Sequence, residues 1–204
     1  MKPKIPLILK VVVFILLPVT FRAQSGDQLA EFSEKKYKIN HCGMTVLTCW
    51  ASVNIVGGTA GYFISSDKKE KSFYAMNAAW GLVNFAIALP GFLGKKTTYN
   101  LKKEALKDQK KTEKIFLINA GLDLVYIGGG IALDQVAVNQ KDADNKAIYS
   151  GFAESIIMQG GALLIFDSVM FSLNKKNRKK HLQPILDNAE IGFAPNGFSL
   201  RYSF

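Results

Sequence analysis

Four long stretches of this sequence are almost free of charged residues. Residues 42–66 and 72–94 contain no Asp, Glu, Lys or Arg, 115–133 contains one and 151–173 contains two. A helix needs about 20 predominantly apolar residues to cross the hydrocarbon core of a bilayer, and each stretch reaches that length. Soluble strands are far shorter, and a soluble helix carries a charged face. The sequence therefore predicts an all-α integral membrane protein, a four-transmembrane-helix bundle over residues 41–174.

Glycine is concentrated in the same four stretches, which hold 14 of the 17 glycines. In a soluble helix each glycine costs about 1 kcal/mol relative to alanine. In lipid, small residues instead let two helix backbones approach closely. We therefore expect glycine faces to pack the bundle, and such faces also suit a homo-oligomer. The glycines expected at helix contacts are Gly57, Gly61, Gly81, Gly128, Gly129, Gly130, Gly160 and Gly161.

The two ends of the chain differ in character from the predicted bundle. Residues 1–23 start with lysines and continue with a short apolar run, which is typical of a signal peptide; an uncleaved anchor is the alternative. Residues 24–40 mix apolar and charged side chains and predict a short interfacial tail. Residues 175–204 begin with a basic cluster. Near their end, Asn196-Gly197 is a typical hairpin turn, and apolar residues alternate with polar ones after it, which predicts a short C-terminal β-hairpin.

Lysine and arginine are distributed unevenly between the predicted helices. One side of the bundle carries 17 of them, eight within 95–114, and the other side carries five. Because cytoplasmic loops are rich in Lys and Arg, this count places the C-terminus in the cytoplasm. A cleaved signal peptide would instead place residue 24 outside the cytoplasm, and with four crossings the C-terminus would lie on that same side. Cleavage and orientation therefore both stay open. The loop 95–114 suits anionic lipid, whereas it lacks the interleaved aromatic residues expected for nucleic-acid binding.

Polar side chains occur near the middle of each predicted helix. An unpartnered polar group in hydrocarbon is costly, so we expect these side chains to face the bundle interior and bond to one another. Two interpretations stay open. Either the layer fixes helix register through hydrogen bonds, or Asp123 and Asp167 line a path for protons or cations. The predicted polar layer consists of Asn54, Asn84, Asn119, Asp123, Gln159 and Asp167.

Signs of catalytic chemistry are few. Two membrane aspartates would suit an intramembrane aspartyl protease, but Gly121-Leu122-Asp123 gives only part of the motif of that family. Phe166 also stands before Asp167 where that family has Tyr. The two Cys and two His residues show no metal-binding spacing, and no phosphate-binding glycine loop occurs between a strand and a helix. We therefore predict no enzyme activity, no metal and no cofactor.

Short motifs recur across the four stretches. They are Trp50-x-x-x-Asn54, Trp80-x-x-x-Asn84, Asn119-x-x-x-Asp123 with Tyr126-x-Gly-Gly, Gln159-Gly-Gly, and Phe166-Asp167. This combination resembles an uncharacterised family of small four-span helical membrane proteins from Bacteroidota, over about 42–204. The resemblance implies a multi-pass protein of the bacterial inner (cytoplasmic) membrane without catalytic activity. We expect a structural or accessory role, and the alternative is a small proton- or cation-coupled transporter or channel.

Overall fold

Four long helices make up most of the chain. The computed structural model describes the backbone of residues 7–187, 190–194 and 197–201, and the side chains of 27–187. The long helices are α1 (Leu7–Ile64), α2 (Lys68–Phe92), α3 (Lys102–Val138) and α4 (Ala143–Asn177). A π-helical turn, η1 (Arg178–Leu182), and the short α5 (Gln183–Asp187) follow α4, and then come β1 (Glu190–Ala194) and β2 (Gly197–Arg201).

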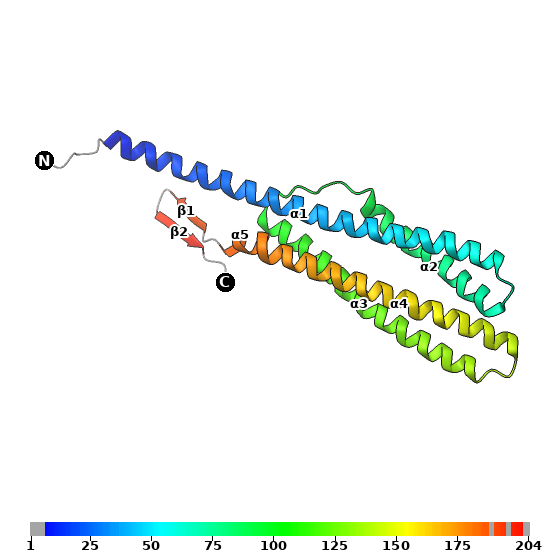
Figure 1. Ribbon diagram of the computed structural model, residues 1–204. Coiled ribbons are helices and arrows are strands. Elements are labelled where there is room, and N and C mark those ends of the chain that lie inside the picture. Colours follow the sequence, from blue (N-terminus) through cyan, green and yellow to red (C-terminus); the bar gives the residue numbers. More distant parts are fainter. Residues whose placement is uncertain (1–6, 188–189, 195–196, 202–204) are drawn as a thin grey trace.

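The long helices form two antiparallel hairpins that lie side by side (Figure 1). α1 packs along α2, α3 packs along α4, and α2 and α4 make the main contact between the hairpins. The short turns after α1 and α3 lie at the same end of the bundle, where Lys68 pairs with Asp144 and Lys69 pairs with Glu154. The 93–101 connection, the start of α3 and the chain after α4 lie at the opposite end, which we call the open end.

Aspartate side chains start two of the helices at the short turns. The Asp67 carboxylate accepts a hydrogen bond from the Glu70 N–H at 2.9 Å, and the Asp142 carboxylate accepts one from the Asn145 N–H at 2.8 Å. Such caps satisfy N–H groups of the first helical turn that have no partner within the helix. The caps therefore fix where α2 and α4 begin.

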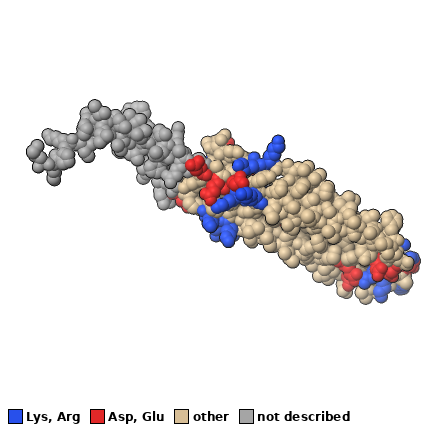
Figure 2. All heavy atoms as spheres, turned by 45° about the horizontal axis from the view of Figure 1, so that its top comes forward, with Lys and Arg blue, Asp and Glu red and all other residues tan. Residues whose placement is uncertain are grey.

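The distribution of side chains is inverted relative to a soluble protein. Large apolar side chains such as Val56, Val125 and Ile165 are exposed, whereas polar ones such as Asn77 and Gln159 are buried. On the face shown in Figure 2, the charged side chains gather toward the two ends, and the surface between them is almost uncharged. A soluble helix bundle instead buries its apolar face and exposes charge. The middle of this bundle therefore has the surface that an apolar environment favours.

Among the residues that the structure describes, three helical segments are long and apolar enough to cross a membrane: Lys68–Phe92, Lys102–Val138 and Ala143–Asp187. They contain the third and fourth predicted stretches and all but the last two residues of the second. The first predicted stretch, 42–66, lies mostly in α1, whose described residues do not include such a segment. Polar residues make the stretch 42–66 less apolar than the other three. The hydroxyl or amide group of four of them donates a hydrogen bond to the carbonyl oxygen four residues earlier. These residues are Thr45, Thr48, Ser52 and Asn54.

Residues 27–41 of α1 belong to the bundle. α1 has 58 residues, about 87 Å at the usual helical rise, and it continues through the predicted boundaries at 23 and 40. Leu29 and Phe32 lie in a small apolar core with Tyr99, Ala105 and Leu182 at the open end. The predicted interfacial tail 24–40 is therefore not a separate segment, because its apolar side chains have partners on the connection, on α3 and on η1.

The chain after the fourth long helix combines helix and strand. Residues 175–187, predicted as the start of a basic tail, continue the helix through η1 and α5. β1 and β2 then pair antiparallel, with Phe193 opposite Phe198. This pairing lies where the sequence predicts a hairpin, and Asn196 of the predicted turn lies outside the described residues.

Candidate functional site

Gln159 lies at the centre of a hydrogen-bond network that joins α1, α2 and α4. Its Nε2 donates to Asn54 Oδ1 and to Asn77 Oδ1, both at 2.6 Å, and its Oε1 accepts from Trp50 Nε1 at 3.0 Å. The side chain of Gln159 is fully buried. Asn54 and Asn77 also donate to the carbonyl oxygens of Trp50 and Phe73. Every side-chain nitrogen and oxygen in the Gln159 network therefore has a partner.

A pair of carboxyl groups joins α3 to α4. Asp167 lies eight residues beyond Gln159 on α4, which is about 12 Å along the helix axis. Asp123 and Asp167 are buried, and their carboxyl groups lie close enough to interact with each other, as Asn119 does with Asp167. Two carboxyl groups can share a hydrogen bond only when one of them carries a proton. Asp123 Oδ2 has no hydrogen-bond partner within the described part of the chain.

The residues predicted as one polar layer are divided between separate places. Asn54 and Gln159 belong to the Gln159 network, and Asn119, Asp123 and Asp167 form the carboxyl pair and its donor. The two groups lie at different depths in the bundle. The sixth residue, Asn84, is buried but belongs to neither group, and its Nδ2 has no hydrogen-bond partner among residues 27–187.

Two members of the Gln159 network are absent from the predicted layer. Asn77 lies seven residues before Asn84 on the same face of α2, so helical periodicity was the signal that could have found it. Trp50 joins the network through its indole N–H, which donates to Gln159 Oε1.

A third polar group lies toward the open end. Gln109 donates to the carbonyl oxygen of Asn174 at 2.9 Å, and Asn174 donates to Asn40 Oδ1 at 2.9 Å. Arg178 bonds to both carboxylate oxygens of Glu113, at 2.8 and 3.1 Å. Sequence reasoning missed this group because its charged members lie outside the apolar stretches and resembled solvated loop residues. The group links α1, α3 and α4 where those stretches end.

A buried lysine connects α1 to α3 at the open end. Lys36 Nζ donates to the Tyr99 hydroxyl at 3.0 Å and forms an ion pair with Asp108, which also accepts from the Tyr99 hydroxyl. Burial raises the pKa of Asp108, but the hydrogen bonds from Lys36 and Tyr99 and the charge of Lys36 outweigh it, so the pKa lies below its ordinary value. Burial and the bond to Asp108 raise the pKa of Tyr99. Near neutral pH, Asp108 is therefore ionised and Tyr99 is neutral.

The glycines predicted at helix contacts fall into two sets. A Cβ atom at Gly61, Gly81, Gly130 or Gly160 would lie closer than 3.0 Å to an atom of a neighbouring helix. Gly151, which was not predicted, makes the tightest approach: its Cβ would lie 2.1 Å from the backbone oxygen of Lys69. The predicted glycines with open space around them are Gly57, Gly128, Gly129 and Gly161.

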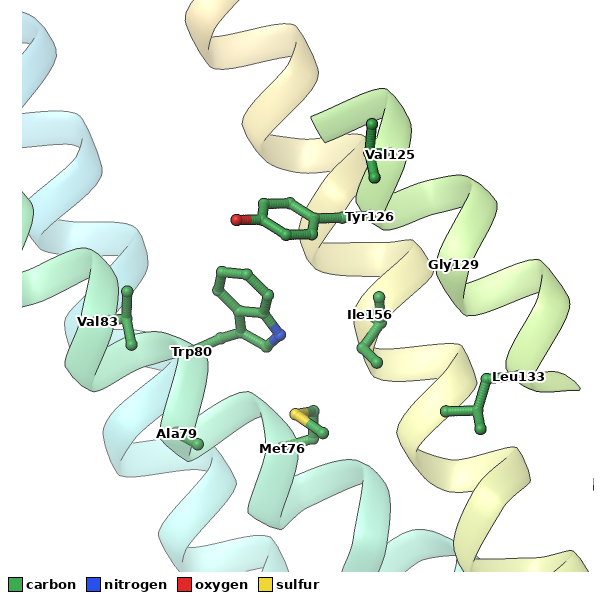
Figure 3. A pocket seen from close by; sticks show the side chains of 9 residues that line it. All are labelled: Met76, Ala79, Trp80, Val83, Val125, Tyr126, Gly129, Leu133 and Ile156. Atoms are coloured by element: carbon green, nitrogen blue, oxygen red, sulfur yellow. The ribbon is translucent and has the colours of Figure 1, made fainter. Parts of the chain in front are cut away.

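An apolar groove of about 780 Å³ lies between α2 and α3 (Figure 3). Trp80 of α2 and Tyr126 of α3 meet there edge to face, with their ring centroids 4.9 Å apart. Ile156 of α4 also lines the groove, and Met76 and Leu133 lie toward one end of it in the view of Figure 3. The groove arises because the two hairpins meet through α2 and α4, which leaves space beside α3.

In the described part of the chain, no group of three or more His, Cys, Asp or Glu side chains could hold a metal ion. Cys42 and Cys49 are free thiols on α1, and both are exposed.

Fold and site together define a class: a bundle of helical hairpins with a polar interior, an apolar surface and three segments able to cross a membrane. A family model described as Family of unknown function (DUF6992) matches residues 46–168, and the chain belongs to this family. The matched region contains the Gln159 network and the carboxyl pair and ends before η1. No curated protein and no solved structure matches the chain.

Proposed function

We propose that this protein is a non-catalytic, multi-pass protein of a bacterial inner membrane with a structural or accessory role. The observation that carries the proposal is the completeness of the Gln159 network. A network in which every polar atom is bonded fixes the relative positions of helices and leaves no group free for chemistry. The Gln159 network joins both hairpins, so it holds together the contact on which the bundle depends.

The inverted side-chain distribution supports a membrane location for the whole bundle. α1 packs along α2, and α2 is long and apolar enough to cross a membrane. A bilayer around α2 therefore surrounds the neighbouring part of α1, whose exposed residues include Val46, Val53 and Phe63. On this basis residues 42–64 form a fourth crossing. The bilayer is then the main partner, and the open glycines on the apolar surface suit a second copy of the chain.

The two tryptophans provide a test of the membrane placement. In vesicles containing phosphatidylcholine with brominated acyl chains, we expect Trp80 fluorescence, measured in the Trp50→Phe variant, to be quenched strongly. Trp50 fluorescence, measured in the Trp80→Phe variant, should be quenched less, because the Trp50 indole bonds to Gln159 inside the bundle whereas Trp80 lines the open groove. Circular dichroism checks that both variants are folded. Two tryptophans that both escape quenching would contradict the membrane placement.

A second candidate function, a small proton- or cation-coupled transporter or channel, rests on the carboxyl pair. Asp123 and Asp167 face each other inside the bundle, and one oxygen of Asp123 has no partner within the described residues. Neutral polar residues on α4 lie on both sides of the pair, with Gln159 toward one end and Asn174 toward the other. Carboxyl groups inside membrane helices commonly mark ion paths.

The double variant Asp123→Asn with Asp167→Asn separates the two roles. If the pair is structural, we expect a lower unfolding temperature, because the contact between the two carboxyl groups is lost, and no change in pH-driven ion flux across vesicles containing the protein. Gln135→Leu, an exposed site on α3, provides a folded control for the flux measurement. A wild-type flux that disappears in a folded double variant would replace the structural role with the transport role.

A further inference from the structure

A small polar pocket lies beside the end of α2. It has a volume of about 180 Å³ and is formed by α1, the last residues of α2 and the 93–101 connection. Lys36 and Lys95 supply two ammonium groups, and none of the lining residues is acidic. Asn40 and Thr97 add an amide and a hydroxyl. The pocket therefore brings hydrogen-bond donors and positive charge together in one place.

The two lysines have different roles in this pocket. Lys36 is buried and held by Tyr99 and Asp108, so its position is fixed and its charge is partly offset by the Asp108 carboxylate. Lys95 is exposed and has no acidic partner among residues 27–187. The C-terminus of α2, the negative end of its helix dipole, also lies here. Binding of an anion therefore depends on Lys95, with which no acidic side chain among residues 27–187 forms an ion pair.

The position of the pocket suits a molecule that is partly apolar. The apolar part of α2 ends at Phe92, whose ring stacks on His41 with a centroid distance of 5.7 Å, and His41 also contacts Tyr37 at 5.4 Å. Tyrosine side chains such as that of Tyr37 are enriched where a membrane meets water. Large exposed apolar side chains, Val46 on α1 and Ile87 on α2, continue from this level along the bundle. An acyl chain can lie on that surface while a headgroup enters the pocket.

We propose that this pocket binds a phosphate group, carried either by an anionic phospholipid headgroup or by free inorganic phosphate. Basic pockets between helices at the membrane surface bind lipid headgroups in this way. The headgroup source rests on the membrane placement proposed above, whereas binding of free phosphate does not. The pocket is separate from the Gln159 network, so binding of free phosphate can fail or hold whatever the role of that network.

The test uses the full chain in a neutral detergent, with three probes: inorganic phosphate, phosphatidylglycerol and phosphatidylcholine. The shift in unfolding temperature is measured against probe concentration, and native mass spectrometry counts bound lipid. Lys95→Gln should weaken phosphate or phosphatidylglycerol binding about fivefold, the loss expected for one lysine near anionic lipid. Lys110→Gln removes an equally exposed charge on α3 outside the pocket and is the matched control.

The outcomes separate the two sources and the general surface effect. Saturable binding of inorganic phosphate that Lys95→Gln weakens assigns the pocket to the free ion. Saturable binding of phosphatidylglycerol alone, weakened in the same way, assigns it to a headgroup. Equal losses in Lys95→Gln and Lys110→Gln, or equal binding of phosphatidylglycerol and phosphatidylcholine, overturn the proposal. Lys95→Glu adds a second measurement at an exposed position, and it should abolish saturation without lowering the unfolding temperature of the unliganded protein.

Discussion

Replacing Gln159 with leucine is expected to lower the free energy of unfolding by about 2–4 kcal/mol. The change leaves Asn54 Oδ1, Asn77 Oδ1 and Trp50 Nε1 without their interhelical partners inside the bundle. Hydrogen bonds between membrane helices average about 0.6 kcal/mol, and a buried polar group left unpaired costs about 1–3 kcal/mol. Because three atoms lose their partner together, the sum is large for a single substitution.

The measurement is reversible unfolding by sodium dodecyl sulfate in mixed micelles, followed by circular dichroism. Gln135→Leu makes the same chemical change at an exposed position of α3 and should have little effect. The triple variant Asn54→Leu, Asn77→Leu and Gln159→Leu should recover part of the loss, because it also removes the two unpaired amide oxygens. An unfolding free energy for Gln159→Leu equal to that of the wild type would show that the network does not hold the helices together.

The sequence predicts the helices best where the signal is local. Length and apolar composition place α2, α3 and α4 at 72–94, 115–133 and 151–173, since each stretch carries the signal within itself. They do not predict the extension of α1 before residue 42, nor that it packs against an extension of α3. Those extensions depend on pairs such as Lys36 with Asp108, which come from different helices. Read one at a time, such charges indicate loops, and only their pairing in space makes them part of the bundle.

The polar site was predictable as a set of residues and not as an arrangement. A polar residue within an apolar stretch signals burial by itself, and Gln159, Asp123 and Asp167 are buried. Which of them meet depends on which helices are neighbours and on the rotation of each helix about its axis. α4 contacts α2 on one side and α3 on another, so Gln159 and Asp167 enter different groups although they lie on one helix.

The same limit applies to the glycines. Gly160 and Gly161 are adjacent in the sequence and share its pattern, yet a Cβ at Gly160 would meet Ile127 at 2.9 Å, whereas Gly161 faces open space. Composition shows that helices approach closely somewhere, and helix rotation decides at which residue. Gly151 shows the consequence most clearly, because its backbone lies directly against that of α2 near the short turns.

Gly151→Ala is therefore expected to lower the free energy of unfolding by about 2–3 kcal/mol, whereas Gly161→Ala should leave it unchanged or raise it by up to about 1 kcal/mol. A Cβ at residue 151 would lie 2.1 Å from the backbone oxygen of Lys69 and 2.9 Å from the backbone nitrogen of Phe73. Backbone atoms cannot rotate away as a side chain can, so α2 and α4 must separate. At residue 161 alanine adds only its higher helix propensity.

The two variants are compared in the same unfolding experiment, because both replace glycine with alanine within α4 and differ only in what the new methyl group meets. Separation of α2 from α4 should also disturb the ion pair of Lys69 with Glu154 at the same end. A disulfide between cysteines introduced by Lys69→Cys and Glu154→Cys should therefore form more slowly in the Gly151→Ala background than in the Gly161→Ala background. Equal unfolding free energies for the two alanine variants would mean that α2 and α4 do not approach as closely at Gly151 as the structure shows, and the contact between the hairpins would have to lie elsewhere.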